Sequence, residues 1–534
     1  MGAPAGALAT KNLLRTILSF PVLLGACLSA AAFAVARLHL PDSDTWWHLV
    51  VGEGILTTGT WPTVDPYSFT VSGHEWIAYE WLGEVVMALA TRLSAPGGSA
   101  SGGGSLSALA GLLIGLSALV MVLVYVYAWL RSGNSKAAFL ASALVWPLAA
   151  VIFVPRPQLL GYIFLLITLI CLEAFRQGRN WTLWLLPLVF LVWVNTHGTF
   201  VFGFVVLGAY GVGGLMKFRL GGLAAEPWTP AQRRRLAVVL LLCVLAITLT
   251  PYGTRPAAYP LELALLQPTN VASIAEWQPM PFDLFGGKLF LLLVLAFFAL
   301  QMFFPLVYRL EEMGLLALTI YAASTHRRFV VFFAIVFAPL LAVQLARWVP
   351  RYQPAKDRPL LNAVLIALVV VHLVVFFPTA DELKQMVADR FPHGAVEYLR
   401  EHKITQPMLN EYAWGGYLIW AAGPEHKVFI DGRADLYEYA GVLTDWLDLS
   451  RLAPHTPFLL RKYGFGACLL QRDRPLGTFL ASQPEWEQVY SDELSVLLVR
   501  RTPSVANSGR PTAAMAAAAL SAANSQAAAR QQPF

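Results

Sequence analysis

The sequence predicts an α-helical polytopic membrane protein that carries a small α/β domain at its C-terminal end. Three observations support this fold class. Hydrophobic residues make up 57% of the 534 residues and charged residues only 13%, which is too apolar for a soluble globular protein. Apolar runs long enough to cross a bilayer recur along the first 377 residues. After Phe377 the composition turns polar.

The membrane part is predicted from two groups of apolar runs. Those of spanning length are 16–36, 106–130, 137–154, 159–175, 200–216, 289–307, 329–345 and 360–377. Shorter runs at 181–194, 236–250 and 313–323 can span only within a bundle, where neighbouring helices cover their polar ends. Together the runs predict about eleven transmembrane helices in a domain that covers residues 1–377.

Charged residues divide unevenly between the two ends of these runs. With the N-terminus in the cytoplasm, Arg131, Arg176 and the run 233–235 all fall inside, as the positive-inside rule requires. The net charge of +6 therefore reflects membrane orientation, and no nucleic-acid partner is expected. We expect a bacterial inner (plasma) membrane protein whose C-terminal domain is extracytoplasmic. The assignment depends on the run 313–323, because all later loops change sides if it does not span.

A long first outer loop, residues 37–105, separates the first two spans of full length. Residues 44–56 predict a short amphipathic helix and residues 75–93 a second helix at the membrane surface. Three glutamates interrupt the second segment, which argues against a span there. The segment 59–72 between them is extended and rich in turns, and 96–105 is a Gly/Ser-rich linker.

The polar C-terminal region predicts a small α/β domain at residues 378–503. Helical patterns alternate with strand-like runs; the helices are expected at 395–402 and 436–449, and the strands at 427–430, 467–470 and 495–499. The remaining segment, 504–534, is rich in Ala, Ser, Gln and Pro and is expected to be disordered.

The first outer loop begins with an acidic and aromatic motif, Asp42-Ser43-Asp44-Thr45-Trp46-Trp47-His48. Ionisable side chains at the bilayer surface are costly unless function retains them. A carboxylate at this half-dry boundary has a raised pKa and can take a proton from an attacking hydroxyl. We interpret Asp44 as the catalytic base, with Asp42 and His48 as catalytic partners that orient it. The alternative is a surface carboxylate beside tryptophans that anchor the interface.

The same motif contains groups that bind metals, but its spacing is not a metal signature. Oxygen and imidazole ligands suit divalent cations, so Asp42, Asp44 and His48 could hold one. We assign no metal ligands on this basis, and no cofactor is certain.

Polar residues at the outer ends of other spans form a candidate substrate-binding site. They are Arg156, Asn195, His197, Arg255, Glu276, His326, Arg327 and Arg328. Guanidinium forks clamp phosphate and diphosphate groups, which is the role expected of the arginines. The alternative for Arg327 and Arg328 is that the pair marks a cytoplasmic span end. Asn195 and His197 could equally hydrogen-bond neighbouring helices.

Short motifs in the first outer loop are similar to those of a known family. They are Asp44 after the first span, Ile55 and Leu56 at the end of the first loop helix, the turn Gly59-Thr60-Trp61-Pro62, and Glu80 with Trp81 in the second helix. With this layout the chain resembles the GT-C superfamily of polytopic glycosyltransferases, in particular its protein mannosyltransferase and aminoarabinose transferase branch. The segments 412–417 and 428–433 look like the C-terminal domain of bacterial membrane proteins with the same layout.

The resemblance implies a GT-C-like fold and a reaction. A polyprenyl-phosphate-linked donor in the membrane would give its sugar to a glycan, lipid or protein acceptor outside the cytoplasm, with inversion of the anomeric centre. Asp44 would deprotonate the acceptor, and the arginines would stabilise the leaving phosphate. The apolar bundle would hold the prenyl tail.

Two other function classes are compatible with the composition. A transporter or flippase of a lipid-linked or polar solute would place charged sites near the bilayer midplane, whereas the ionisable residues here lie at span ends. A non-catalytic envelope scaffold would use the membrane part only as an anchor, for which so many spans are unnecessary. In the C-terminal domain, Trp414, Trp420, Asp431 and Arg433 either recognise the acceptor or form a core and an ion pair.

Overall fold

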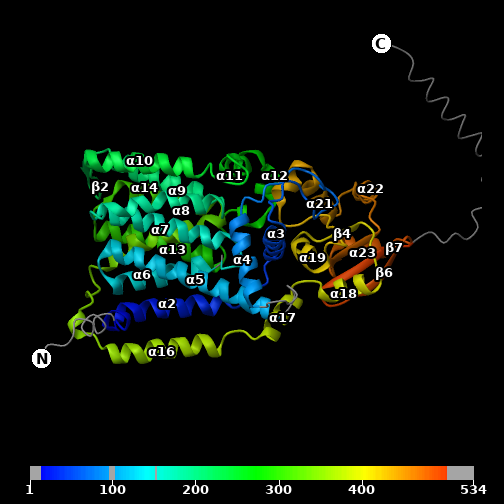
Figure 1. Ribbon diagram of the computed structural model, residues 1–534, viewed down its shortest axis with the longest axis horizontal. Coiled ribbons are helices and arrows are strands. Elements are labelled where there is room, and N and C mark those ends of the chain that lie inside the picture. The colour runs from blue at the N-terminus through cyan, green and yellow to red at the C-terminus, as the bar shows by residue number, and fades with distance from the viewer. Residues whose placement is uncertain (1–13, 95–102, 151–152, 502–534) are drawn as a thin grey trace, which may run out of the picture.

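The computed structural model describes residues 14–94, 103–150 and 153–501, so the predicted tail 504–534 and most of the linker 96–105 lie outside it. It shows a helical bundle with a mixed α/β domain at one end (Figure 1). Each apolar run predicted from the sequence lies on a helix: α2 (Phe20–Ala36), α5 (Gly103–Ser132), α6 (Ser135–Ala149), α7 (Gln158–Arg176), η2 (Asn180–Leu185) followed by α8 (Leu186–Val194), α9 (Phe200–Gly213), α10 (Pro230–Ala246), α13 (Phe285–Phe303), α14 (Leu310–Thr325), α15 (Val330–Leu345) and α16 (Pro359–Val375).

The lengths of these helices identify a multi-pass membrane protein. Among the described residues, four helices are long and apolar enough to cross a bilayer, and a fifth is counted if the bent pair α16 and α17 (Ala380–Ala388) is one span. Four more apolar helices, α2, α6, η2 with α8, and α9, are shorter. The total of about eleven spans stays a prediction.

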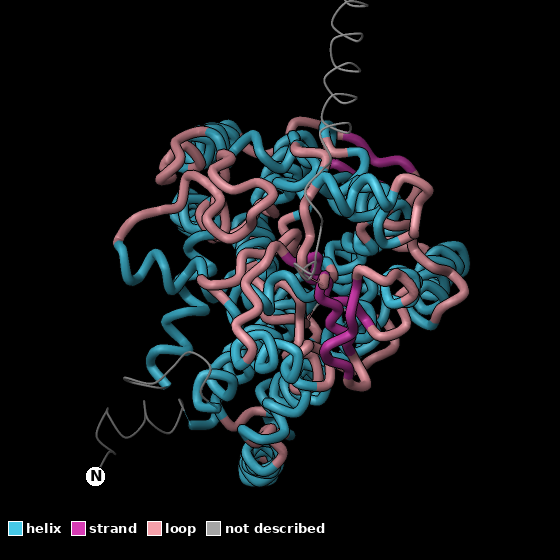
Figure 2. Tube along the Cα trace, turned by 90° about the vertical axis from the view of Figure 1, so that its right-hand side faces the viewer, coloured by secondary structure: helices cyan, strands magenta, loops and turns pink. Residues whose placement is uncertain are grey.

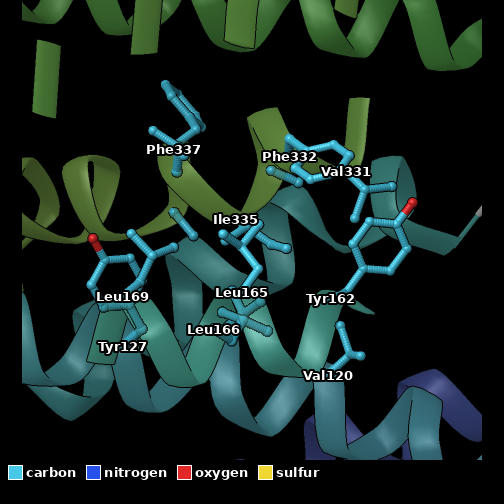
Figure 3. Packing of buried hydrophobic residues seen from close by; sticks show 14 of the residues in the cluster. Val120, Tyr127, Tyr162, Leu165, Leu166, Leu169, Val331, Phe332, Ile335 and Phe337 are labelled. Atoms are coloured by element: carbon cyan, nitrogen blue, oxygen red, sulfur yellow. The ribbon is translucent and has the colours of Figure 1, made fainter. Parts of the chain in front are cut away.

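Helix α15 forms the centre of the bundle and is buried along almost its whole length. In Figure 3 its side chains Phe332 and Ile335 face α7, where Tyr162 and Leu165 meet them. The rings of Tyr162 and Phe332 lie edge to face, with centroids 5.5 Å apart. Because lipid tails are as apolar as these side chains, close packing rather than removal from water holds the helices together.

The end of the bundle where α2 begins is closed by ion pairs and a small sheet. Strands β1 (Phe218–Leu220) and β2 (Leu223–Ala225) pair antiparallel, and β2 pairs parallel with β3 (Tyr308–Arg309). The buried carboxylates here each bind a guanidinium, in the pairs Glu173 with Arg309, Glu311 with Arg176 and Glu312 with Arg131. A buried charge is tolerated when it is paired in this way, so this cluster is structural.

Helix α14 runs from this end of the bundle to the other. Glu311 in its first turn binds Arg176, 2.6 Å away. His326, directly after its last residue, places Nδ1 2.6 Å from the carbonyl oxygen of Trp277 at the opposite end. Among the described helices, α14 is not one of those long and apolar enough to cross a bilayer, so the span expected at 313–323 stays a prediction.

The first outer loop forms two helices that stand between the bundle and the C-terminal domain (Figure 1). The predicted first helix is confirmed as α3 (Thr45–Thr58), with Asp44 at its N-cap. The predicted amphipathic character is wrong, because α3 is covered on both sides, by α4 on one side and by the C-terminal domain on the other. Gly52 permits the close approach, since a Cβ there would collide with the backbone of Glu84 on α4.

The second loop helix is shorter than predicted. It is α4 (Trp81–Ser94), whereas the segment 75–80 is not helical. The chain folds back at Gly73, whose φ of 77° suits glycine, and the amide of Trp76 donates to the carbonyl of Thr63 at 3.0 Å. Residues 75–80 are therefore not helical, because the chain at Trp76 pairs with the preceding extended segment at Thr63.

The C-terminal domain contains a four-stranded sheet in the order β4-β5-β7-β6. Its strands are β4 (Met408–Asn410), β5 (Ala467–Gln471), β6 (Trp486–Ser491) and β7 (Ser495–Arg500); β4 and β5 are parallel and the other pairs antiparallel. The surrounding helices are α17, α18 (His393–Glu401), η6 (Tyr412–Trp414), α19 (Gly415–Ala422), α20 (Ala434–Tyr439), α21 (Val442–Ser450), α22 (Thr456–Lys462) and α23 (Pro475–Ala481).

Two sequence predictions for this domain are wrong. The helix expected at 436–449 is broken into α20 and α21 at Gly441, which has a φ of 73°. The strand expected at 427–430 does not join the sheet. Instead, Val428 pairs with the first outer loop, where its amide donates to the carbonyl of Tyr67 at 3.1 Å. A strand-like pattern identifies extended backbone but not its partner.

The first outer loop and the C-terminal domain share one hydrophobic core. Figure 2 views this end of the molecule, where the strands lie among loops and helices. Trp46 of α3 is fully buried against Tyr417 and Trp420 of the domain, with centroid distances of 5.5 and 4.7 Å. The buried Trp414 donates its Nε1 hydrogen to the carbonyl of Arg390. These contacts give the two tryptophans of the domain a structural role.

A buried ion pair also joins the domain to the loop. Arg433 donates from Nε and Nη2 to both oxygens of Asp431, at 2.8 and 2.6 Å, and from Nη1 to Asp65 of the first outer loop at 2.7 Å. The hydroxyl of Tyr437 donates to Asp431 as well. The arrangement fits the structural interpretation of Asp431 and Arg433.

Candidate active site

Three carboxylates converge on one guanidinium between the bundle and the C-terminal domain. Arg156, in the loop before α7, donates from Nε and Nη2 to the two oxygens of Asp42 at 2.7 and 2.8 Å. Its Nη1 lies 2.9 Å from Asp44 Oδ2 and 3.0 Å from Glu276 Oε1. The structure therefore brings together four of the predicted site residues from separate loops, and we call them the Arg156 cluster.

Asp44 has the properties of a base in this cluster. Its pKa is raised to about 6: burial is the main cause, Arg156 opposes it, and the negative charges of Asp42 and Glu276 add to it. The Asp44 amide also donates to Asp42 Oδ1 at 3.1 Å, which fixes the backbone at the start of α3. Near neutral pH such a carboxyl is ionised yet basic enough to accept a proton.

The C-terminal domain covers one side of the Arg156 cluster. Gly432 lies directly against Asp44, and a Cβ at this position would collide with the carboxylate oxygen. The hydroxyl of Tyr412 donates to the carbonyl of Gly432 at 3.1 Å, which holds this backbone in place. A glycine is required at 432 for the two parts of the chain to meet here.

The sequence predicted that His48 orients Asp44, and this prediction is wrong. His48 belongs instead to a second polar group. Its Nδ1 lies 3.0 Å from Glu84 Oε1, and its Nε2 lies 3.6 Å from Glu80 Oε2. Glu80 Oε1 in turn lies 3.3 Å from His197 Nε2. We call these four residues the Glu80 group. His48 misses Asp44 because its side chain leaves α3 toward the neighbouring helix α4, where it meets Glu84, and toward Glu80, which directly precedes α4.

Burial keeps the Glu80 group largely uncharged. It raises the pKa of Glu80 to about 8 and that of Glu84 well above its ordinary value. The pKa of His48 lies well below its usual value, mainly through burial and then through the charge of Arg156. The pKa of His197 is lowered to about 3 by burial, with smaller contributions from Arg328 and Arg156. Near neutral pH both imidazoles are therefore neutral, and the glutamates favour their protonated form.

The arginines predicted to clamp phosphate have different positions. Arg328 stacks over Trp277, with its guanidinium carbon 4.2 Å from the ring centroid, and no ion pair or hydrogen bond of its side chain is found within the described ranges. Arg327 is exposed. Arg255 pairs with Glu75 at the surface, apart from the Arg156 cluster. Of the three, Arg328 is the one that stacks on an aromatic ring of the site, Trp277.

Asn195 and His326 make structural contacts. The Asn195 side chain accepts from Trp81 Nε1 at 2.8 Å and donates to the carbonyls of Leu191 and Leu249, which joins three segments. His326 binds the carbonyl of Trp277 through Nδ1. None of these hydrogen bonds involves a residue of the Arg156 cluster, so both side chains support the surrounding structure.

A narrow apolar groove reaches Arg156 from the side of the bundle. Its walls come from α4, α5 and α7, and they are Val86, Met87, Leu112, Leu113, Leu116, Pro155, Pro157, Leu159 and Leu160. Arg156 is the one charged residue in this lining. The arrangement suits an apolar chain, because the charge of Arg156 is already paired with Asp42, Asp44 and Glu276.

Within the ranges that the structure describes, no group of three or more His, Cys, Asp or Glu residues is placed to share an ion. Asp42 and Asp44 instead turn their oxygens toward Arg156.

Sequence reasoning missed several residues of this region. Glu80 and Glu84 were noted as interruptions of a helix but not as site residues, although two glutamates four apart in an apolar segment would meet on one helical face. Nothing in the sequence distinguishes Trp277 as the ring beneath Arg328, or Gly432 as the neighbour of Asp44.

Comparisons with known proteins extend this description. No protein-family model and no curated protein matches the chain. Among solved structures, it is similar to the oligosaccharyltransferase of Archaeoglobus fulgidus tethered to an acceptor peptide containing the NVT sequon, with a TM-score of 0.51, 12% identity, and coverage of 84% of this chain and 69% of that chain. The oligosaccharyltransferase AglB from Archaeoglobus fulgidus, in complex with an inhibitory peptide and a dolichol-phosphate, gives a TM-score of 0.50 at 12% identity and the same coverage.

A bacterial structure is also found. ArnT from Cupriavidus metallidurans in the apo state gives a TM-score of 0.48 at 15% identity, with coverage of 89% of this chain and 97% of that chain. At such low identities the likeness to the oligosaccharyltransferase concerns the fold. The chain is thus a multi-pass membrane protein with a fold like that of the GT-C glycosyltransferases.

Proposed function

We propose that this protein is a GT-C-type glycosyltransferase that moves a sugar from a polyprenyl-phosphate-linked donor to an extracytoplasmic acceptor. The observation that carries the proposal is Asp44, a basic carboxylate held by Arg156 where the first outer loop meets the bundle. The GT-C-like fold supports the reaction class. The oligosaccharyltransferase of this fold was solved with a dolichol-phosphate, which supports a lipid-phosphate donor.

Asp44 takes the proton of the acceptor hydroxyl or amine as that group attacks the anomeric carbon. Arg156 orients the carboxylate, and Asp42 and Glu276 hold the guanidinium in position through its other hydrogens. A single displacement of this kind inverts the anomeric centre. The carboxylate needs to be ionised when the acceptor arrives, so the rate is expected to rise with pH through about 6.

Arg328 binds the phosphate of the donor. Its planar guanidinium is held over Trp277, which leaves its hydrogens available for an anion. The apolar groove beside Arg156 takes the first isoprene units of the lipid tail. The donor then lies with its phosphate at the edge of the membrane and its sugar toward Asp44. With the predicted orientation, this end of the bundle is extracytoplasmic.

The Arg328→Ala variant is expected to lower kcat/KM for the polyprenyl-phosphate sugar by about 10- to 100-fold, because a charge-assisted hydrogen bond contributes about 1.5–3 kcal/mol. The matched control is Arg327→Ala, which removes the same charge from the exposed neighbouring residue. Both variants are assayed with labelled donor in lipid. Equal losses in the two variants would contradict a specific phosphate contact by Arg328.

The Leu116→Trp variant is designed to fill the apolar groove. It is expected to raise KM for a long-chain donor about tenfold or more, since a ring displaces isoprene units from the lining. A water-soluble donor with a single isoprene unit should keep its kcat/KM. Leu119→Trp, on the same helix but exposed and outside the lining, is the control. If Leu116→Trp affects long and short donors alike, the groove does not bind the tail.

A further inference from the structure

Two of the long apolar helices, α13 and α15, end next to each other close to β3. Both are among the described helices that are long and apolar enough to cross a bilayer, and their last residues are Phe303 and Leu345. The side chain of Gln344 donates to the carbonyl of Phe304 at 3.1 Å, which ties the two helix ends together. Because each helix spans the apolar layer, the residues directly after them lie at the membrane surface.

Arg347 lies just after α15 and packs against two aromatic rings. Its guanidinium carbon is 5.8 Å from the ring centroid of Phe304 and 5.9 Å from that of Trp348, within the range of cation–π attraction. The two rings meet edge to face, with centroids 5.2 Å apart. Nη1 of Arg347 also donates to the carbonyls of Phe304 and Pro305, at 2.9 and 3.4 Å. These contacts fix the guanidinium in one position on the surface.

The charge of Arg347 has no counter-ion within the described residues. Only its Nη1 forms hydrogen bonds there, so the hydrogens on Nε and Nη2 are available to an anion. Arg351, four residues further on, is exposed and adds a second positive charge. The buried carboxylates at this end of the bundle are already bound by other arginines. A held but unpaired guanidinium at a membrane surface matches a phosphate group.

Exposed apolar side chains accompany this cation at the end of α13. Met302 and Phe303 are 79% and 75% exposed, and Trp348 is 49% exposed. At the end of a membrane-spanning helix such side chains contact acyl chains, and a tryptophan lies at the level of the headgroups. The surface therefore combines a cation at the water boundary with apolar side chains toward the bilayer.

We propose that Arg347, Phe304 and Trp348 bind the headgroup phosphate of an anionic phospholipid, whose acyl chain lies along Met302 and Phe303. Nε and Nη2 of Arg347 donate to two phosphate oxygens, in the forked arrangement that a guanidinium offers. With the predicted orientation, this lipid belongs to the cytoplasmic leaflet. The inference does not depend on the proposed sugar transfer.

The charges at this surface favour an anionic lipid over a zwitterionic one. Phosphatidylcholine would bring its own cation close to Arg347 and Arg351, where like charges repel. Phosphatidylglycerol carries the phosphate without a cation. The alternative is that the arginine and the rings only set the depth of the two helices in the bilayer, as interfacial anchors do. An anchor of that kind does not select between the two lipids.

The test is native mass spectrometry of the full-length protein in detergent, titrated with phosphatidylglycerol or phosphatidylcholine. Wild type is expected to bind phosphatidylglycerol more tightly. Arg347→Gln should weaken this binding about fivefold, since one basic side chain near a lipid surface contributes on that order. Arg347→Lys should lose less, because it keeps the charge but not the fork. The control, Arg351→Gln, removes an exposed charge that has no aromatic contact and should lose about twofold or less.

Phe303→Ala keeps the proposal testable if the arginine variants do not fold. This side chain is 75% exposed, so the fold should tolerate its loss, while phosphatidylglycerol binding should weaken about threefold through lost apolar contact. Thermal unfolding without added lipid verifies the fold of each variant.

Three results would overturn the proposal. They are equal binding of the two lipids by wild type, equal losses in Arg347→Gln and Arg351→Gln, and unchanged phosphatidylglycerol binding in a folded Phe303→Ala protein. Water-soluble glycerol phosphate is the remaining comparison, and it should not displace the lipid. Displacement would identify the ligand as a free phosphate and exclude a role for the apolar side chains.

Discussion

The Asp44→Asn variant is expected to lose about 10³-fold in kcat, because general base catalysis contributes about 10²- to 10⁴-fold. Asparagine has the same shape and its oxygen can still accept from Arg156, so the Arg156 cluster keeps its packing. What it lacks is the ability to take a proton. The measurement is single-turnover transfer of labelled sugar, with thermal unfolding of both proteins to verify the fold.

Asp42→Asn is the matched control for this prediction. Asp42 binds the same guanidinium through both oxygens but is not the base in our account. Its loss should weaken the orientation of Arg156 and reduce the rate by about tenfold, much less than the loss of Asp44. Equal rates for Asp44→Asn and wild type would exclude Asp44 as the base. A larger loss for Asp42→Asn would transfer the role to that residue.

The Arg433→Met variant is expected to lower the free energy of unfolding by about 3–5 kcal/mol, because it leaves the buried carboxylates of Asp431 and Asp65 without a counter-ion. Since Asp65 belongs to the first outer loop, the C-terminal domain should also separate from that loop. Trypsin should then cleave between α16 and α18 faster than in wild type. Transfer activity should also fall when the domain separates, because Gly432 of the domain covers Asp44.

The control for this prediction is Arg92→Met, which removes an arginine from an exposed ion pair with Glu53 in the same loop. Exposed pairs of this kind are well solvated, so the unfolding midpoint should stay unchanged. A stable Arg433→Met protein with wild-type resistance to trypsin would show that the shared hydrophobic core alone holds the domain in place.

The helices of the bundle could be predicted from the sequence because each depends on local composition. An apolar run satisfies its own backbone hydrogen bonds as a helix, wherever its neighbours lie. The start of α3 was predicted for a similar reason, since Asp44 precedes an apolar segment. These features require no knowledge of contacts between distant parts of the chain.

The contacts of the site depend on such distant parts and could not be predicted in detail. Arg156 meets Asp42 across 114 residues, and the expected phosphate clamp of four arginines is divided among ion pairing, aromatic stacking and the surface. The docking of the C-terminal domain onto the first outer loop was not anticipated either. It relies on Gly432 and on the pairing of Val428 with Tyr67, which no local pattern reveals.

The central claim, that this chain transfers sugar from a lipid-phosphate donor with Asp44 as the base, is tested most directly by one assay. Purified protein in lipid vesicles is given a panel of labelled polyprenyl-phosphate sugars, with wild type and Asp44→Asn compared at equal folding. Our account predicts that wild type consumes at least one donor and that Asp44→Asn consumes the same donor about 10³-fold more slowly. Consumption of no donor by folded wild-type protein, or equal consumption by both proteins, would contradict it.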